Sequence, residues 1–266
     1  MNSAPGMNEW FVEAFRSEYL DLYPHRDRED AARAVAFLKG LSSDKSLSAQ
    51  FDSGAFVLDC ACGAGRHLEV LREAGFHAVG IDLSADLLRR ALENGAGAAQ
   101  TPMPVARADM RRLPFPNTAF ATVLSLFTSF GYFEDHDDDR RVIFEIARVL
   151  RPGGLFLLDF LNAAAVRANL VPRSERSLPD GGRLIEERHI DSRSNHVIKR
   201  ARREWPAGRR REWTESVHLY EAAEIEAMMR AAALTPLRRY GDFDHSLHAP
   251  SSPRLIVVAQ ASRGAS

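Results

Sequence analysis

The 266-residue chain has little cysteine and no long hydrophobic run. Its two cysteines, Cys60 and Cys62, lie two residues apart on one extended segment, where a disulfide would be strained, so a reduced protein is expected. Two thiols without nearby Cys or His partners also make a poor zinc site, and no metal is predicted. The longest apolar runs, such as residues 155–158, are far too short to cross a bilayer.

The sequence also lacks an excess of charge of either sign. The 35 Lys and Arg residues stand against 36 Asp and Glu residues, so no global field indicates nucleic acid or a membrane surface as partner. Residues 1–9 lack a basic start followed by an apolar core, and no signal peptide is expected. These absences predict a cytoplasmic protein without a membrane partner.

The most informative stretch that is present reads FVLDCACGAG, at residues 56–65. A short apolar run ends at Asp59, a turn with Gly63 and Gly65 follows, and a helical pattern begins after it. Such a turn lets a ligand approach bare backbone, and the N-terminus of the helix presents free N–H groups. A second apolar run ends at Asp82. Strand, glycine turn, helix, strand and acid together predict a site for a cofactor that contains adenosine.

Strand and helix patterns alternate through residues 55–160, which predicts an α/β fold with a parallel sheet covered on both faces. Residues 8–22 and 29–40 have helical spacing, and Asn94-Gly95 is expected to end a helix that begins at Ser84. Residues 183–220 alternate with period two instead. This pattern predicts a small antiparallel β insertion after the fifth strand.

The glycine turn departs from the dinucleotide-binding fingerprint G-x-G-x-x-G. Leu68 occupies the place of the third glycine, which that fold needs for close packing of helix and strand. No Lys-Ser or Lys-Thr follows the turn, which excludes a phosphate-binding P-loop. A nicotinamide-dependent oxidoreductase is therefore disfavoured.

Four ordered segments between about residues 57 and 159 resemble the class I S-adenosylmethionine-dependent methyltransferases. LDCACGAGRHLEVL resembles the family's cofactor loop, GIDLSADLL its ribose-binding segment, ADMRRLPF its adenine-binding segment, and VLRPGGLFLLDF its passage from the closing helix into strand five. The similarity is greatest to small-molecule N-methyltransferases of the glycine and amino-sugar type, through the TSFGYF segment. The resemblance implies S-adenosylmethionine as cofactor and a Rossmann-like, seven-stranded, mostly parallel sheet with helices on both faces.

The resemblance and the strand pattern together divide the chain into four parts. Residues 1–54 are expected to form an N-terminal helical lid, and residues 55–170 the cofactor-binding core. Residues 171–220 are expected to form the antiparallel insertion, as a roof over the substrate pocket. Residues 221–266 would supply a C-terminal helix and the closing strands of the core.

The resemblance also implies a set of cofactor-binding residues, namely Tyr23, Asp59, Cys60, Ala61, Gly63, Asp82, Leu83, Asp109, Met110 and Leu126. In this set Asp82 would accept the two ribose hydroxyls, Asp109 would accept from the adenine amino group, and Tyr23 would contact the carboxylate of the methionine tail. Simpler roles remain open, since Asp59 and Asp109 could belong to ordinary turns and Asp82 could serve the following helix N-terminus.

Methyl transfer from a sulfonium is an in-line displacement that mainly needs alignment of the nucleophile and exclusion of water. An amine acceptor must arrive deprotonated, and a nearby side chain could take its proton. Tyr132 and His245 are the candidate catalytic residues, because their segments end at the crevice. His245 could also be an ordinary loop residue. The predicted activity is methyl transfer to a nitrogen or oxygen of a small molecule.

Two other functions remain open. Between Arg173 and Trp213, eleven Arg and one Lys stand against five Glu and two Asp, and an RNA methyltransferase could use such a face. Charged outer faces are common on edge strands, however, and no aromatic residues interleave regularly with the basic ones, so nucleic acid is the disfavoured partner. A protein that binds the cofactor without catalysis is the second alternative. A monomer or a homodimer is expected.

Overall fold

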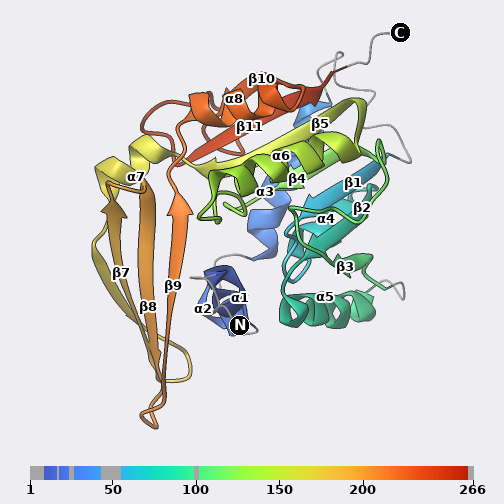
Figure 1. The fold of residues 1–266 in the computed structure, drawn as a ribbon. Helices are drawn as coiled ribbons and strands as arrows, with labels where there is room; N and C mark the ends of the chain where they lie inside the picture. Colours follow the sequence, from blue (N-terminus) through green and yellow to red (C-terminus); the bar gives the residue numbers. More distant parts are fainter. Residues whose placement is uncertain (1–8, 17, 24–26, 43–54, 99–101, 263–266) are drawn as a thin grey trace, which may run out of the picture.

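The computed structural model describes residues 9–16, 18–23, 27–42, 55–98 and 102–262, and its centre is a seven-stranded sheet (Figure 1). The strand order is β10-β11-β5-β4-β1-β2-β3. These strands are β1 (Phe56–Cys60), β2 (His77–Asp82), β3 (Val105–Arg107), β4 (Phe120–Ser125), β5 (Leu150–Leu161), β10 (Leu234–Tyr240) and β11 (Arg254–Ala261). Strands β1 to β5 pair in parallel, whereas β11 runs antiparallel to β5 and to β10. The predicted Rossmann-like, mostly parallel sheet is confirmed.

Helices cover both faces of this sheet. They are α3 (Arg28–Leu41), α4 (Arg66–Glu73), α5 (Ala85–Ala98), α6 (His136–Val149) and α8 (Ala222–Ala231). The middle strands are buried on both faces, and β5 shows why its sequence is continuously apolar. Phe156 and Leu158 pack in the cluster that contains α6 and α8, while Leu155 and Leu157 pack in the cluster that contains α3 and α4.

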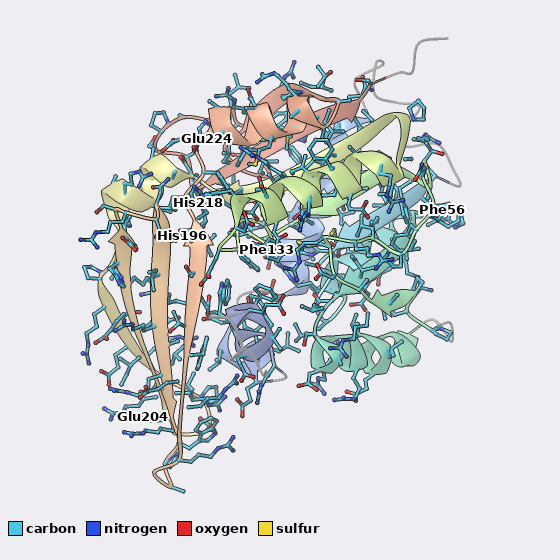
Figure 2. The ribbon with its side chains drawn as sticks, in the orientation of Figure 1. Phe56, Phe133, His196, Glu204, His218 and Glu224 are labelled. Atoms are coloured by element: carbon cyan, nitrogen blue, oxygen red, sulfur yellow. The ribbon has the colours of Figure 1, made fainter. Side chains whose placement is uncertain are left out.

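A separate antiparallel sheet follows α7 (Ala163–Asn169) and comprises β6 (Arg173–Ser177), β7 (Arg183–Asp191), β8 (His196–Glu204) and β9 (Arg210–His218). We call it the insert sheet. The predicted antiparallel insertion is confirmed, with one more strand, β6, than the alternating pattern of residues 183–220 predicted. Figure 2 shows His196 and His218 at the end of the insert sheet nearest the core, and Glu204 at the opposite end.

Two short helices, α1 (Trp10–Ala14) and α2 (Tyr19–Leu22), lie between the insert sheet and the core (Figure 1). We call them the lid helices. The expectation of one helix over residues 8–22 is wrong, because groups outside the helix take the last carbonyls of α1. Arg211 donates to the Glu13 carbonyl, and the Ser84 hydroxyl donates to the Phe15 carbonyl at 2.6 Å. Residues 1–8, 17, 24–26 and 43–54 of the predicted N-terminal lid lie outside the described residues.

The end of α5 also differs from the sequence prediction. Asn94-Gly95 does not end α5, which continues to Ala98. Gly95 lies so close to Met103 that a Cβ there would be 3.1 Å from the Met103 Cβ, so this glycine serves packing within the helix. Within the described ranges, no helix combines the length and apolar character needed to span a membrane.

Candidate cofactor site

A cavity of about 690 Å³ lies where β1, β2, β3 and β4 end, under the lid helices. This volume is typical of sites for small molecules and cofactors. Nine of the predicted cofactor residues line the cavity: Tyr23, Asp59, Ala61, Gly63, Asp82, Leu83, Asp109, Met110 and Leu126. Cys60 does not line it, because its side chain is buried within the core beneath the turn.

The glycine turn is tied to the neighbouring strand β2. The Gly63 N–H donates to the Asp82 carboxylate at 2.8 Å, and the Cys62 N–H donates to the Ile81 carbonyl at the same distance. Gly65 caps α4 with a φ of 80°, and a Cβ there would lie 3.2 Å from the Ala91 Cβ. Left-handed backbone and close approach together explain why glycine is required at position 65.

Asp82 holds the turn through backbone contacts. Its second oxygen accepts the Ser84 N–H at 2.8 Å. Burial raises the pKa of the Asp82 carboxyl, while N–H donation from Ser84, Gly63 and Leu83 opposes that rise. A carboxylate that faces the cavity and already accepts backbone N–H groups fits further donors such as hydroxyls.

Asp59 is a buried carboxyl group that accepts no hydrogen bond from the described residues. Its residue is 1% exposed, and neither oxygen has a hydrogen-bond partner among the described residues. The nearest imidazole nitrogen, His67 Nδ1, lies 4.0 Å away. Burial raises the pKa of Asp59 to about 7 and lowers the pKa of His67 well below its usual value. An orphaned acceptor on the cavity wall fits a ligand that carries N–H or O–H donors.

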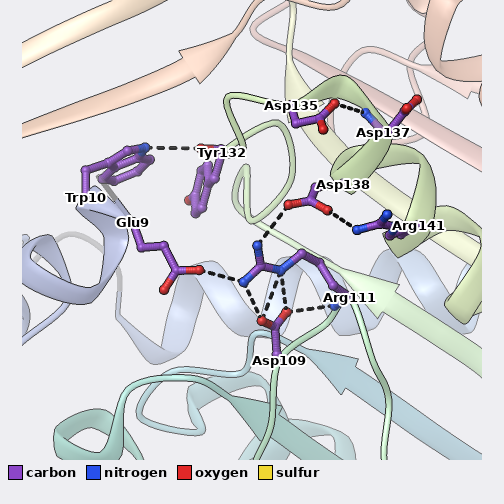
Figure 3. A network of polar contacts seen from close by, with 9 residues as sticks. All are labelled: Glu9, Trp10, Asp109, Arg111, Tyr132, Asp135, Asp137, Asp138 and Arg141. Carbon is purple, nitrogen blue, oxygen red and sulfur yellow. Dashed lines mark hydrogen bonds and ion pairs between the residues drawn. The ribbon is translucent and has the colours of Figure 1, made fainter. Parts of the chain in front are cut away.

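Asp109 is engaged in a way that the sequence did not predict. Both of its oxygens accept hydrogen bonds from Arg111, which also reaches Glu9 at 2.6 Å and Asp138 at 2.9 Å (Figure 3). Burial by itself would raise the pKa of Asp109, but the Arg111 contacts outweigh it and hold that pKa below its usual value. The adenine amino group would therefore have to share Asp109 with Arg111.

Tyr23 lines the cavity, but its hydroxyl contacts the insert sheet. It accepts a hydrogen bond from Lys199 Nζ at 2.8 Å and donates to Glu186 Oε1 at 3.1 Å. Burial and the nearby carboxylates raise the pKa of the Tyr23 phenol. The predicted contact between Tyr23 and a ligand carboxylate would compete with these partners.

The structure separates the two candidate catalytic residues. Tyr132 lines the cavity, and its ring lies 4.8 Å from that of Trp10 and 5.8 Å from that of Phe15. His245 does not line the cavity, because its ring stacks on Phe37 at 4.5 Å, beside α3. The structure thus brings Tyr132, but not His245, together with the predicted cofactor residues.

Further aromatic residues line the cavity beside the predicted cofactor residues. Phe11, Phe15 and Tyr19 line the cavity from the lid helices, and their spacing of four residues was the available signal. Phe127 also lines it, in a left-handed backbone conformation with a φ of 57°. The guanidinium groups of Arg66 and Arg254 lie 3.9 and 4.6 Å from its ring centre.

No group of three or more His, Cys, Asp or Glu side chains suited to a metal ion occurs in the part of the chain that the structure describes. The cavity wall instead combines a glycine turn, an orphaned carboxylate and acids at the ends of two neighbouring strands. This donor set fits an organic cofactor with a ribose and an ammonium group.

Comparison with known proteins agrees with this geometry. Residues 57–154 match the methyltransferase domain family. The glycine/sarcosine N-methyltransferase of Halorhodospira halochloris is 33% identical over 107 residues, which cover 40% of each protein. The dTDP-3-amino-3,4,6-trideoxy-alpha-D-glucopyranose N,N-dimethyltransferase of Streptomyces venezuelae is 27% identical over 187 residues, covering 67% of this chain and 74% of that protein.

A solved structure extends the likeness of fold to almost the whole chain. The S-adenosylmethionine-bound amino pentose methyltransferase CalS10 from Micromonospora echinaspora superposes with a TM-score of 0.66 at 19% identity, covering 98% of this chain and 100% of that one. The chain spans about half the length of several curated relatives that it matches. Residues 57–154 of the chain thus match a methyltransferase domain, and the chain shares its fold with an S-adenosylmethionine-bound methyltransferase.

Proposed function

We propose that the chain transfers a methyl group from S-adenosylmethionine to the nitrogen of a small-molecule amine. The observation that carries this proposal is a strip of aromatic rings that lines the same cavity as the glycine turn. Tyr132, Phe15, Tyr19 and Tyr23 all line the cavity. Successive ring centres along this strip are 5.8, 4.9 and 4.9 Å apart.

The cofactor half of the cavity would use the acids at the strand ends. We propose that Asp82 accepts the ribose hydroxyls and that the orphaned Asp59 carboxylate accepts from the ammonium of the methionine tail. Met110 would contribute backbone to the adenine, because Arg111 already holds the Asp109 side chain. When bound, the cofactor supplies a methyl group activated by its sulfonium.

The acceptor half would use the aromatic strip. Ring faces present little polar surface and attract the positive charge that a neutral amine gains as it accepts the methyl group, so the strip can hold the acceptor while it excludes water. Tyr132 lies at the end of the strip nearest β4 and is proposed to orient the amine. A small acceptor agrees with a cavity of about 690 Å³, and an amine agrees with the named activities of the two curated relatives.

RNA methylation is a weaker candidate, because most arginines of the insert sheet are already paired. Seven of the eleven between residues 173 and 213 form ion pairs with carboxylates of described residues: Arg173, Arg183, Arg188, Arg202, Arg203, Arg209 and Arg211. Paired guanidinium groups offer less to a phosphate backbone than free ones. A small acceptor, a cytoplasmic setting and a monomeric or dimeric state remain our proposals.

The test is a turnover screen with the wild-type protein. S-adenosylmethionine is incubated with amino sugars, amino acids, hydroxylated analogues that lack the amine, and tRNA, and S-adenosylhomocysteine is measured. We expect turnover with at least one amine and none with its hydroxylated analogue. Turnover with tRNA alone, or cofactor binding without turnover on any acceptor, would overturn the proposal.

The screen needs two matched variants. Asp82→Ala removes the proposed ribose acceptor and should abolish turnover. Asp137→Asn alters an exposed carboxylate on α6 whose partner is Arg140, so it should leave turnover unchanged.

A further inference from the structure

The segment Gly131–Tyr132 is a junction between three parts of the molecule. The Gly131 N–H donates to Asp139 Oδ1 on α6 at 3.2 Å. The Gly131 carbonyl accepts the N–H of His218, the last residue of β9, at 2.8 Å. The Tyr132 carbonyl accepts from Trp10 Nε1 of the lid helix α1 at 3.2 Å (Figure 3). Core, insert sheet and lid thus each contribute one hydrogen bond to two consecutive residues.

Asp139 is the buried end of this junction. Its residue is 0% exposed, and its second oxygen accepts the Tyr220 hydroxyl at 2.9 Å. The Tyr220 oxygen also lies 2.8 Å from His136 Nδ1. The carboxylate therefore joins the segment that precedes α8 to the segment that carries Tyr132.

The backbone at Gly131 leaves little freedom for another arrangement. Its φ is 78°, and a Cβ there would lie 3.2 Å from two ring carbons of Phe160 and 3.4 Å from the His218 carbonyl. The hydrogen bonds to the N–H and the carbonyl of Gly131 hold its backbone in place. They therefore set the direction in which the next side chain leaves the backbone. That next side chain is Tyr132, which lines the cavity and packs on Trp10 and Phe15.

We infer that Asp139 and Tyr220 are positioning residues, which fix the Tyr132 segment and, through Trp10, hold the lid helices closed over the acceptor half of the cavity. The inference rests on the proposed function, because it assigns the acceptor to that half. Asp139 does not line the cavity, so its effect on an acceptor would pass through Tyr132 and the lid.

The test compares Tyr220→Phe with Tyr240→Phe. Tyr220→Phe removes only the hydroxyl that donates to Asp139. Tyr240→Phe is the control, because Tyr240 is another buried tyrosine that packs on Phe37, away from the junction. For Tyr220→Phe we expect KM for the amine to rise about tenfold, because a hydrogen bond to a buried carboxyl group is lost. We expect kcat and the Kd for S-adenosylmethionine to stay within about twofold.

Hydrogen exchange of the lid amides gives a readout that does not need activity. In Tyr220→Phe, exchange in residues 10–14 and 19–22 should be several-fold faster than in the wild type and in Tyr240→Phe. Asp139→Asn, which keeps one carbonyl oxygen for Gly131, should shift KM and lid exchange in the same direction. Lid exchange equal to that of Tyr240→Phe, or a matching loss of cofactor affinity, would overturn the inference.

Failure of the proposed function gives a different result. If the wild type methylates no amine, the proposed function falls, while the exchange of the lid amides still decides whether Asp139 and Tyr220 hold the lid.

Discussion

The Asp82 carboxylate accepts the Gly63 N–H at 2.8 Å, so the acid that ends β2 holds the glycine turn that follows β1. One side chain thereby shapes the turn and faces the cavity beside it. Because the turn and the carboxylate are already held in place before a ligand binds, less conformational entropy is lost on binding.

Replacing Asp82 by Asn should weaken S-adenosylmethionine binding about 10- to 100-fold, because charge-assisted hydrogen bonds become neutral ones and the Gly63 N–H can lose its acceptor. Isothermal titration measures the affinity directly. Asp137→Asn is the control for a carboxylate distant from the cavity. Unchanged affinity in Asp82→Asn would contradict the ribose role.

Asp59→Asn should change the pH dependence of stability. The folded-state pKa of Asp59 is raised to about 7, so its protonated form stabilises the fold fully below about pH 4, and this contribution is lost as the pH rises through 7. The variant carries no charge there, so at pH 8 without ligand we expect it to be more stable than the wild type by roughly 1–3 kcal/mol. Thermal melts between pH 5 and pH 8 measure this difference.

The melts must compare Asp59→Asn with the wild type at each pH, because other groups make the protein more stable as the pH rises. The pKa values of His67 and His218 are lowered by burial, the latter to about 4, so their contribution grows as the pH rises toward 6.5. The same variant should bind S-adenosylmethionine more weakly, since the proposed ammonium acceptor is lost. An equal pH slope in variant and wild type would show that Asp59 does not titrate as described.

Arg111→Gln should loosen the lid at its other attachment. Arg111 joins Asp109, Asp138 and Glu9, and its loss leaves three carboxylates without their common cation (Figure 3). We expect dissociation of S-adenosylmethionine to accelerate about tenfold in stopped-flow measurements, because Arg111 also holds Asp109 beside the proposed adenine position, which the Asp139–Tyr220 contact does not. Arg141→Gln removes an exposed partner of the same Asp138, and exposed pairs contribute little, so it serves as control. Equal dissociation rates in the two variants would contradict this role of Arg111.

Lys199→Met should destabilise the contact between lid and insert sheet. Lys199 Nζ lies 2.8 Å from the Tyr23 hydroxyl and 2.7 Å from Glu215 Oε2, so its removal leaves Glu215 and Glu186 without their shared cation. We expect the free energy of unfolding to fall by roughly 1–3 kcal/mol. Chemical denaturation of the double variant Lys199→Met/Glu215→Gln should recover part of that loss, and no recovery would refute this electrostatic cause.

Much of the core could be predicted because its signals are local. The apolar run before Asp59, the glycine turn and the acid at Asp82 follow one another within a short stretch, and each has a direct structural consequence. The contacts of Tyr23 with Lys199 and of Arg111 with Glu9 could not be predicted in this way. Lys199 lies 176 residues after Tyr23 and reaches it only because the insert sheet packs on the lid helices. Arg111 binds Glu9 across 102 residues for a similar reason.

The break between α1 and α2 has the same origin. Residues 8–22 have the spacing of one helix, but Arg211 and Ser84 take carbonyl groups from its middle. His245 is a second example. Its place in a loop near the predicted crevice gave no indication that its ring stacks on Phe37. In both cases tertiary contacts decide a feature that a local pattern leaves open.

The central claim is the transfer of a methyl group to nitrogen, and the most direct test follows an isotopically labelled methyl group. The protein is given S-adenosylmethionine labelled at that methyl, together with the amine that gives the highest turnover, and the product is identified by NMR. The account predicts an N-methyl signal in the amine, formed in equal amount to S-adenosylhomocysteine, and none with Asp82→Ala. Label on oxygen, label on RNA, or cofactor binding without any labelled product would contradict it.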